Sequence, residues 1–324
     1  MINKLGICMT QRCNAACDIC CFSCSPASQQ HLDADLIFTV LNQAASTDHV
    51  KEIHFTGGEP FLDFDLLCDC VSQATALGLS CFIHTNGFWG ADEKDATNKI
   101  DRLKAAGVKH ICFSADEFHQ KFIPQEHLRT ALRTVRYSEI ASSVITLSYK
   151  ISEVANLTQW DDQVKSILGE EAAFTTIAPS IPIRIGRAET VFPATKDPEN
   201  CRCSFDSMAQ LGFDGNYYVC CSPVSHVIPH LRLGSAYEMT VGDIAPAILA
   251  NDYLFVLIKI GFRWYVKTAR RLGFDIPERI GSPCDLCRLL FENSTLIEAL
   301  ALPVETVAYH HRLAHQAGSA SKVK

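Results

Sequence analysis

Short β-like runs alternate with helical patterns from residue 4 to about residue 188, and this rhythm limits the folds open to the chain. The expected strands cover residues 4–9, 50–55, 80–84, 109–114, 144–149 and 173–178, and the expected helices between them cover 34–46, 65–77, 93–106, 125–137 and 156–168. Strands that alternate with helices of this length pair in parallel through right-handed crossovers. The pattern therefore predicts an α/β fold of six β/α units, a full or partial barrel with its active face at the C-terminal ends of the strands.

The β/α rhythm stops near residue 190, where we place a boundary between a domain at 1–190 and a smaller domain at 191–324. In this last third, Asp214-Gly215-Asn216 between two β-like runs predicts a hairpin turn. Residues 246–272 are largely apolar and predict one long helix, and residues 318–324 predict a frayed polar tail.

Charge and hydropathy exclude several classes of function. The chain of 324 residues carries 29 basic and 36 acidic side chains, and its net charge of −7 does not attract a phosphate backbone, so we expect no nucleic-acid partner. No apolar run approaches the ~20 residues that a transmembrane helix needs, so no membrane span is expected. The opening residues Met1 to Leu5 lack the features of a signal peptide, which predicts a cytoplasmic protein.

Sixteen cysteines are unusually many for a chain with no expected use for disulfides, and their grouping indicates metal binding. Two groups stand apart from four scattered cysteines that read as small buried apolar residues. The first group is near the start, and the second lies in the last third: Cys8, Cys13, Cys17, Cys20, Cys21 and Cys24, then Cys201, Cys203, Cys220, Cys221, Cys284 and Cys287. Two metal sites are therefore expected.

The first site is predicted at Cys13, Cys17 and Cys20, a Cys-x3-Cys-x2-Cys run directly after the first expected strand. A structural zinc site takes four closed ligands, and a four-iron cluster held by four cysteines is saturated. A cluster held by three leaves one iron open. A zinc knuckle is the alternative for this spacing, and Cys21 and Cys24 are interpreted as surplus loop thiols.

The triplet and four further motifs resemble the radical S-adenosylmethionine (radical SAM) superfamily. The motifs follow expected strands, or close the β/α series: Gly57-Gly58-Glu59-Pro60, Thr85-Asn86-Gly87, Ser114-Ala115-Asp116 and Gly186-Arg187-Ala188. The resemblance implies a radical SAM barrel in which the triplet holds a [4Fe-4S] cluster that binds S-adenosylmethionine. It also implies that residues 57–60 lie near the methionine ammonium, and that Asn86, Ser114 and Asp116 contact ribose and methionine.

The second group supplies six sulfurs, of which four suffice for a closed auxiliary [4Fe-4S] cluster. Cys284 and Cys287 have a common metal-binding spacing, and both are expected to bind. Neighbours in an extended strand point to opposite faces, so only one of Cys220 and Cys221 is expected to bind. The other would be a thiol beside the first site, placed to donate a hydrogen atom.

Several longer strings resemble the YydG family of radical SAM peptide epimerases, over nearly the whole chain: Asn86-Gly87-Phe88-Trp89-Gly90, Asp116-Glu117-Phe118-His119, Cys220-Cys221-Ser222-Pro223 and Gly261-Phe262-Arg263-Trp264. The resemblance implies that Cys221 is the hydrogen donor and that Cys220 binds an auxiliary cluster in a SPASM- or twitch-like domain. It favours Cys203 over Cys201 as a further ligand, although the chain has two cysteines there where one is expected. Asp206 matches the acidic residue that the family places near the donor thiol.

The implied reaction converts L-residues to D-residues in a ribosomally synthesised precursor peptide. The 5′-deoxyadenosyl radical removes a Cα hydrogen, and Cys221 returns hydrogen to the opposite face; a one-electron reductant of flavodoxin or ferredoxin type is the second expected partner. The first alternative is a radical SAM maturase that forms a thioether or carbon–carbon cross-link. The second is a non-catalytic iron–sulfur or zinc scaffold, which leaves the motifs after the strands without a role.

Overall fold

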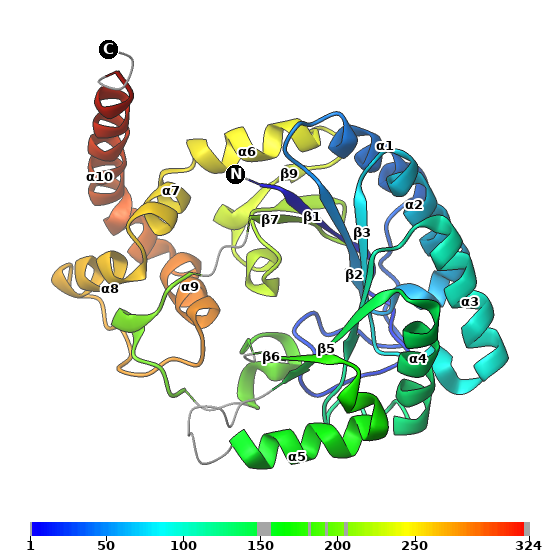
Figure 1. Ribbon diagram of the computed structural model, residues 1–324. Coiled ribbons are helices and arrows are strands. Elements are labelled where there is room, and N and C mark those ends of the chain that lie inside the picture. Colours follow the sequence, from blue (N-terminus) through cyan, green and yellow to red (C-terminus); the bar gives the residue numbers. More distant parts are fainter. Residues whose placement is uncertain (1, 148–156, 181–182, 192–193, 204–206, 321–324) are drawn as a thin grey trace.

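The protein is described by a computed structural model over residues 2–147, 157–180, 183–191, 194–203 and 207–320 (Figure 1). Its nine-stranded sheet has the order β6-β5-β4-β3-β2-β1-β7-β8-β9. The first six strands pair in parallel in chain order: β1 (Lys4–Thr10), β2 (Glu52–Gly57), β3 (Ser80–Thr85), β4 (His110–Ser114), β5 (Ala141–Leu147) and β6 (Thr176–Ser180). This confirms the parallel α/β prediction.

Five helices connect these strands and lie on the outer side of the sheet (Figure 1). They are α1 (Ala34–Ala45), α2 (Phe64–Ala76), α3 (Glu93–Ala106), α4 (Gln125–Ser138) and α5 (Leu157–Leu168). Most bounds lie within one or two residues of the sequence prediction. Strand β5 begins three residues earlier than expected and β6 three residues later, and the expected end of β5 at 148–149 lies outside the described residues.

Helix α3 shows why the helices could be predicted from the sequence. The Asp92 side chain accepts a hydrogen bond from the Asp95 amide and caps the N-terminus, while Gly107 ends the helix with a φ of 94°. Its buried side chains, Ala96, Ile100 and Leu103, are spaced by four and three residues and form one apolar face. Most other positions are polar and face solvent, so both periodicity and caps were visible in the sequence.

The sheet continues past the expected domain boundary near residue 190. Strand β7 (Met208–Leu211) pairs in parallel with β1, and β8 (Asn216–Tyr218) and β9 (Arg232–Ser235) follow in antiparallel order. Gly215 has a φ of 77° in the turn between β7 and β8, which confirms the predicted hairpin. The last third of the chain thus adds three strands to the sheet of the first part.

Helices make up the rest of the chain: α6 (Val241–Ala250), α7 (Asp252–Lys259), α8 (Phe262–Arg271), α9 (Pro283–Glu292) and α10 (Ser294–Ala320). The prediction of one long helix over 246–272 is wrong, because Asn251 is extended and caps α7, and Gly261 takes a φ of 94° before α8. Helix α10 continues to Ala320, so the expected tail is helical at its start; residues 321–324 lie outside the described part.

None of the described helices is by itself long and apolar enough to cross a bilayer. Helices α6 and α7 reach that length and composition only as a pair, and their axes are bent by 78° at the break between them.

Candidate active site

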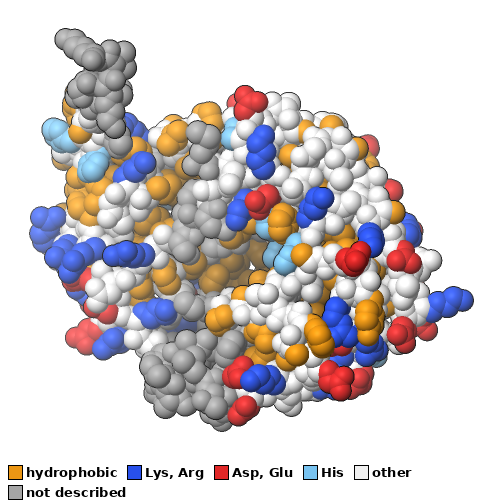
Figure 2. Space-filling model, viewed as in Figure 1, with side chains coloured by type: hydrophobic (Ala, Val, Ile, Leu, Met, Phe, Trp, Pro, Cys, Tyr) orange, Lys and Arg blue, Asp and Glu red, His pale blue; other side chains and the backbone are white. Residues whose placement is uncertain are grey.

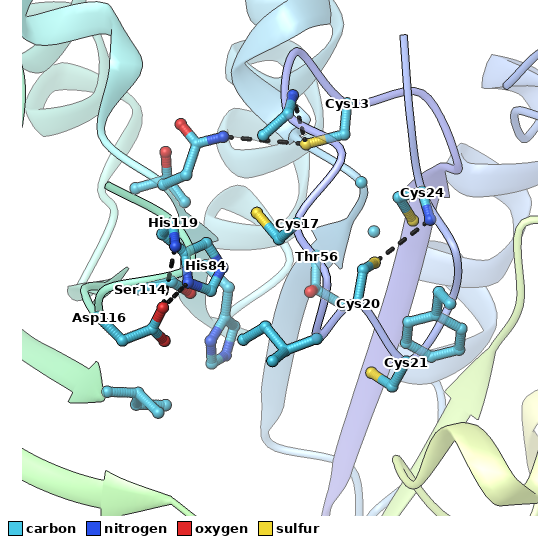
Figure 3. A pocket seen from close by; sticks show the side chains of 18 of the residues that line it. Cys13, Cys17, Cys20, Cys21, Cys24, Thr56, His84, Ser114, Asp116 and His119 are labelled. Carbon is cyan, nitrogen blue, oxygen red and sulfur yellow. Dashed lines mark hydrogen bonds and ion pairs between the residues drawn. The ribbon is translucent and has the colours of Figure 1, made fainter. Parts of the chain in front are cut away.

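A pocket of about 300 Å³ lies at the C-terminal ends of β1 to β4 (Figure 3). Its volume is at the lower end of the range of small-molecule sites. Eight of the ten residues predicted for the cluster, the cofactor or both line it: Cys13, Cys17, Cys20, Gly57, Gly58, Asn86, Ser114 and Asp116. Glu59 and Pro60 are not among the lining residues. The ends of the parallel strands therefore bring together side chains that are up to a hundred residues apart in the chain.

The three thiols of the first predicted cluster belong to the loop that follows β1. Figure 3 shows Cys13, Cys17 and Cys20 on one side of the pocket, with Asp116 and His119 across from them. Burial, together with the nearby Cys13 and Cys20 thiols, raises the pKa of the Cys17 thiol to about 12. The Cys17 thiol thus feels the charges of both other thiols, and Cys13 that of Cys20, as expected of ligands that share one centre.

Cys20 differs from the other two thiols because its sulfur accepts a hydrogen bond from Cys24. The Cys24 amide nitrogen is 3.2 Å from Cys20 Sγ (Figure 3). Hydrogen bonds from Cys24 lower the pKa of Cys20 to about 6, although burial acts in the opposite direction. The interpretation of Cys24 as a surplus thiol is compatible with this supporting contact.

Gly57 and Gly58 pack against the chain where it leaves β1. The Gly58 amide donates to the Thr10 carbonyl at 2.6 Å, and a Cβ on Gly58 would lie 2.1 Å from the Arg12 carbonyl oxygen. A Cβ on Gly57, whose φ is 140°, would lie 2.4 Å from the Thr10 carbonyl oxygen. Both positions therefore exclude side chains, and they hold the start of the cysteine loop against the end of β2.

Glu59 lies behind the pocket and supports the Asn86 loop. Its carboxylate accepts hydrogen bonds from the Asn86 amide at 2.7 Å, the Thr85 hydroxyl at 2.9 Å and the Phe61 amide at 3.1 Å. Burial raises the pKa of Glu59 to about 7, against the effect of these three donors. Asn86 in turn donates from Nδ2 to Asn14 at 2.9 Å. Glu59 is thus linked to the cysteine loop through Asn86.

We expect Glu59→Ala to lower the free energy of unfolding by about 3 kcal/mol, because it leaves buried donors without an acceptor. Urea denaturation of the reduced apoprotein measures the effect. The matched control is Glu52→Ala at the start of β2, where the side chain is 30% exposed and the expected change is below ~1 kcal/mol. Equal losses in the two variants would contradict the supporting role.

Asp116 and His119 form an ion pair at the far side of the pocket, in which Asp116 is buried and His119 is partly exposed. Asp116 Oδ1 lies 2.8 Å from His119 Nδ1 and also accepts from the backbone amides of Phe118 and His119. Burial alone would raise the pKa of Asp116, but the hydrogen bond and charge of His119 hold it below its usual value. The pair fixes Asp116 in one orientation, with both side chains lining the pocket.

Arg187 holds the cysteine loop by two hydrogen bonds to its backbone carbonyls. Its Nε donates to the Cys17 carbonyl at 2.8 Å, and its terminal nitrogen donates to the Cys24 carbonyl at 2.6 Å. Gly186 has a φ of 59°, and a Cβ there would lie 2.6 Å from the Cys21 carbonyl oxygen. The Gly-Arg-Ala motif therefore closes around the loop that carries the first thiols.

Of the four cysteines predicted for an auxiliary cluster, three carry charges that raise the pKa of the fourth, Cys287. Cys284 and Cys287 lie at the start of α9, one helical turn apart, after the Ser282 cap. Burial raises the pKa of Cys287 well above its usual value, and Cys220, Cys284 and Cys203 raise it further, in that order. Burial also raises the pKa of Cys220, and the charges of Cys221, Cys284 and Cys203 raise it further.

Cys201 lies in a different environment from Cys203. It is buried, and its Sγ donates to the Asp197 carbonyl at 3.5 Å. After burial, the charges that affect its pKa are those of Lys196, Asp197 and Asp285. Cys203 is exposed, and its charge raises the pKa of Cys220 and of Cys287. The surroundings thus favour Cys203 as the partner of the other three thiols.

Cys220 and Cys221 do not lie in a strand, because β8 ends at Tyr218 and a bend follows. The strand argument for opposite faces is therefore wrong, but the two side chains still differ. Cys220 is half-buried, whereas Cys221 is exposed and, with Cys21, raises the pKa of Cys8 on β1. Asp206, predicted near the donor thiol, lies outside the described residues.

Part of the chain matches a known family of domains. Residues 7–148 match the radical SAM superfamily model. The chain contains a radical SAM domain. Its sequence is 27% identical over 312 residues to a relative named for peptide biosynthesis, YydG of Bacillus subtilis (strain 168), covering 92% of this chain and 95% of that protein.

A second relative is similar over a shorter stretch. It is the PqqA peptide cyclase of Xanthomonas euvesicatoria pv. vesicatoria (strain 85-10), 34% identical over 110 residues, which are 34% of this chain and 28% of that protein. The similarity to this protein is thus confined to about a third of the chain.

Two solved structures share the fold. Native anSMEcpe with bound AdoMet and Kp18Cys peptide superimposes with a TM-score of 0.56 at 15% identity, over 95% of this chain and 99% of that one. BtrN in complex with AdoMet and 2-DOIA gives 0.51 at 18% identity, over 82% and 90% of the two chains. At these identities the likeness concerns the fold alone.

The radical SAM family implies S-adenosylmethionine and one [4Fe-4S] cluster, and the pocket suits both by its donors. Three thiols face a cavity that also carries amide, hydroxyl and carboxylate groups, as a cluster and a polar cofactor require. Among the described residues, no three His, Cys, Asp or Glu side chains are close enough to hold a single metal ion. A four-iron cluster spreads its thiolates farther apart than one ion does, so its ligands need not meet at a point.

Sequence reasoning gave no role to two further lining residues, Thr56 and His84. Both belong to the inward-facing series of their strands, which alternates with fully buried positions such as Phe55 and Ile83. That alternation was the available signal. It identifies inward-facing positions but not which of them reach the pocket.

Proposed function

We propose that the protein is a radical SAM peptide epimerase that converts L-residues to D-residues in a ribosomally synthesised precursor peptide. The observation that carries the proposal is the division of the Cys220–Cys221 pair. Cys220 is half-buried, and its pKa is raised by burial and by the charges of Cys221, Cys284 and Cys203; its own charge raises the pKa of Cys287. Cys221 is exposed and, together with Cys21 of the pocket, raises the pKa of Cys8. One sulfur is thus assigned to the auxiliary cluster, and its neighbour to hydrogen donation.

The residue assignments follow from this division. Cys13, Cys17 and Cys20 would hold the first [4Fe-4S] cluster, and Cys203, Cys220, Cys284 and Cys287 a second one. Gly57, Gly58, Asn86, Ser114 and Asp116 line the space for S-adenosylmethionine. Glu59 holds the Asn86 amide from behind, and Pro60 follows it outside the pocket.

When bound and reduced by one electron, S-adenosylmethionine supplies a 5′-deoxyadenosyl radical that removes a hydrogen atom from Cα. The peptide residue then has a planar Cα, and its configuration depends on the face that receives the next hydrogen atom. Cys221 donates that atom from its S–H bond. The thiol and the adenosyl group must lie on opposite faces of Cα, which requires both to be held on fixed elements of the chain.

Likeness to relatives named for peptide chemistry supports a peptide substrate. Asp206 is proposed to lie near the donor thiol, as the YydG family resemblance implies. The second expected partner is a one-electron reductant of flavodoxin or ferredoxin type, and a cytoplasmic location is proposed with it.

The test is to incubate the reconstituted protein in deuterated water with S-adenosylmethionine, reductant and the precursor peptide, followed by chiral amino-acid analysis. We expect D-residues, each carrying one deuteron at Cα and no other change in mass. Loss of two hydrogens from the peptide would instead identify a cross-linking maturase. No 5′-deoxyadenosine with any reductant would favour a non-catalytic scaffold.

A further inference from the structure

The outer face of α8 carries a concentrated positive charge on a chain whose net charge is −7. An open depression on this face is lined by Ile260, Arg263, Trp264, Lys267, Arg270 and Arg271. Figure 2 shows Lys and Arg side chains gathered on the side of the molecule where Figure 1 places α8. No acidic side chain is among the described residues that line it.

One carboxylate partly neutralises this face. Glu199 lies 2.7 Å from Arg270 and 3.8 Å from Arg263. The next depression is lined by several acidic residues, Asp275 and Glu278 among them, so the positive area ends there. A net positive area remains along α8, with a half-buried Trp264 in it.

The inner face of α8 packs toward the predicted auxiliary cluster. Tyr265 is fully buried, and its ring lies edge-on to Trp264 at 5.0 Å and to Phe291 at 5.2 Å. Phe291 follows Cys287 by one turn of α9. Burial raises the pKa of the Tyr265 phenol, and Cys287 is one of the neighbouring groups that raise it further. A chain of aromatic ring contacts therefore runs from Trp264 at the positive surface through Tyr265 to Phe291 on α9, the helix that carries Cys287.

We propose that this face of α8 is the docking surface for a small acidic one-electron carrier, whose electron enters the protein at the auxiliary cluster. The inference rests on the proposed function, because it uses the assignment of Cys287 to that cluster. Complementary charge guides an acidic carrier to the face and speeds its association. Electron transfer slows steeply with distance, and the ring contacts from Trp264 to Phe291 lead from this face to the helix that carries Cys287.

The electron restores the donor thiol. After hydrogen donation, Cys221 is a sulfur radical; one electron from the carrier and one proton from water return it to the thiol, and the carrier is oxidised by one electron. Each inversion therefore consumes one electron at this surface. An electron delivered here would serve the step that follows inversion.

The test compares two triple charge reversals of equal size. The test variant, R263E/K267E/R271E, reverses three charges on the α8 face and keeps the ion pair between Arg270 and Glu199. The control variant, K51E/K94E/K109E, reverses three exposed lysines of the β/α part and changes the net charge by the same amount. Binding of a purified reduced flavodoxin to each reconstituted protein is measured at two salt concentrations. We expect about tenfold weaker binding for the α8 variant and little change for the control, and weaker wild-type binding at high salt.

A second readout separates docking from chemistry. With dithionite as the reductant, the α8 variant should turn over like the wild type, whereas with flavodoxin its turnover should fall with the loss of binding. Unchanged flavodoxin binding in the α8 variant would overturn the proposal, as would a loss confined to precursor-peptide binding. If the wild-type protein binds flavodoxin in a charge-dependent way but forms no D-residues, the epimerase proposal is contradicted and the docking surface is supported.

Discussion

Replacing Cys221 by alanine is expected to reduce D-residue formation to the level of a reaction without enzyme, while 5′-deoxyadenosine continues to form. The substitution removes the hydrogen donor but leaves every residue that lines the pocket unchanged. Hydrogen removal from Cα would then proceed without a return from the opposite face. Liquid chromatography of the nucleoside and chiral analysis of the peptide measure the two products from one reaction.

Two further variants define the result. Cys221→Ser keeps the size of the side chain but carries a stronger O–H bond, so it should be as inactive as the alanine variant. Cys68→Ala removes a cysteine from α2, on the outer side of the sheet, and should keep full activity. D-residues formed by Cys221→Ala at the rate of the wild type would remove Cys221 from the reaction.

Cys287→Ala and Cys203→Ala are each expected to lose half of the iron of the reconstituted protein and to form no D-residues. Four thiolates bind all four irons of the cluster. Loss of one thiolate leaves one iron open to solvent, and the cluster then dissociates more readily. Cys287 is the stronger case, because it is buried among Cys220, Cys284 and Cys203. Iron analysis and electron paramagnetic resonance of the reduced protein measure the loss.

Cys201→Ala is the matched control for Cys203→Ala. Cys201 is two residues away, and it donates to the Asp197 carbonyl. We expect this variant to keep its iron and its activity. Iron loss in Cys201→Ala together with full iron in Cys203→Ala would reverse the ligand assignment.

Much of the fold was predictable because local signals agreed with it. Helix α3 combined an Asp92 cap, a Gly107 end and an apolar face, so its bounds were predicted without error. The site was predictable for a related reason: polar breaks directly after parallel strands must meet at one edge of the sheet. Asn86 and Asp116 reach the same pocket by that rule.

The features that were not predictable depend on contacts between distant segments. The break at Gly261 helps to divide the expected long helix into separate helices. A single glycine in an apolar sequence does not by itself predict such a change of chain direction. Pairing of β7 with β1 joins the last third of the chain to the sheet, and no local pattern encodes it. Glu59 is expected beside the cofactor, and its hydrogen bonds from Thr85 and Asn86, which hold the loop after β3, could not be predicted from local patterns.

The most direct measurement of the central claim follows a deuterium label placed at Cα of the residue to be inverted, in ordinary water. If adenosyl and Cys221 act from opposite faces, the label is transferred to 5′-deoxyadenosine, and the D-residue carries none of it. Label that remains at Cα of the D-residue would contradict the account, because inversion would then have occurred without exchange of that hydrogen.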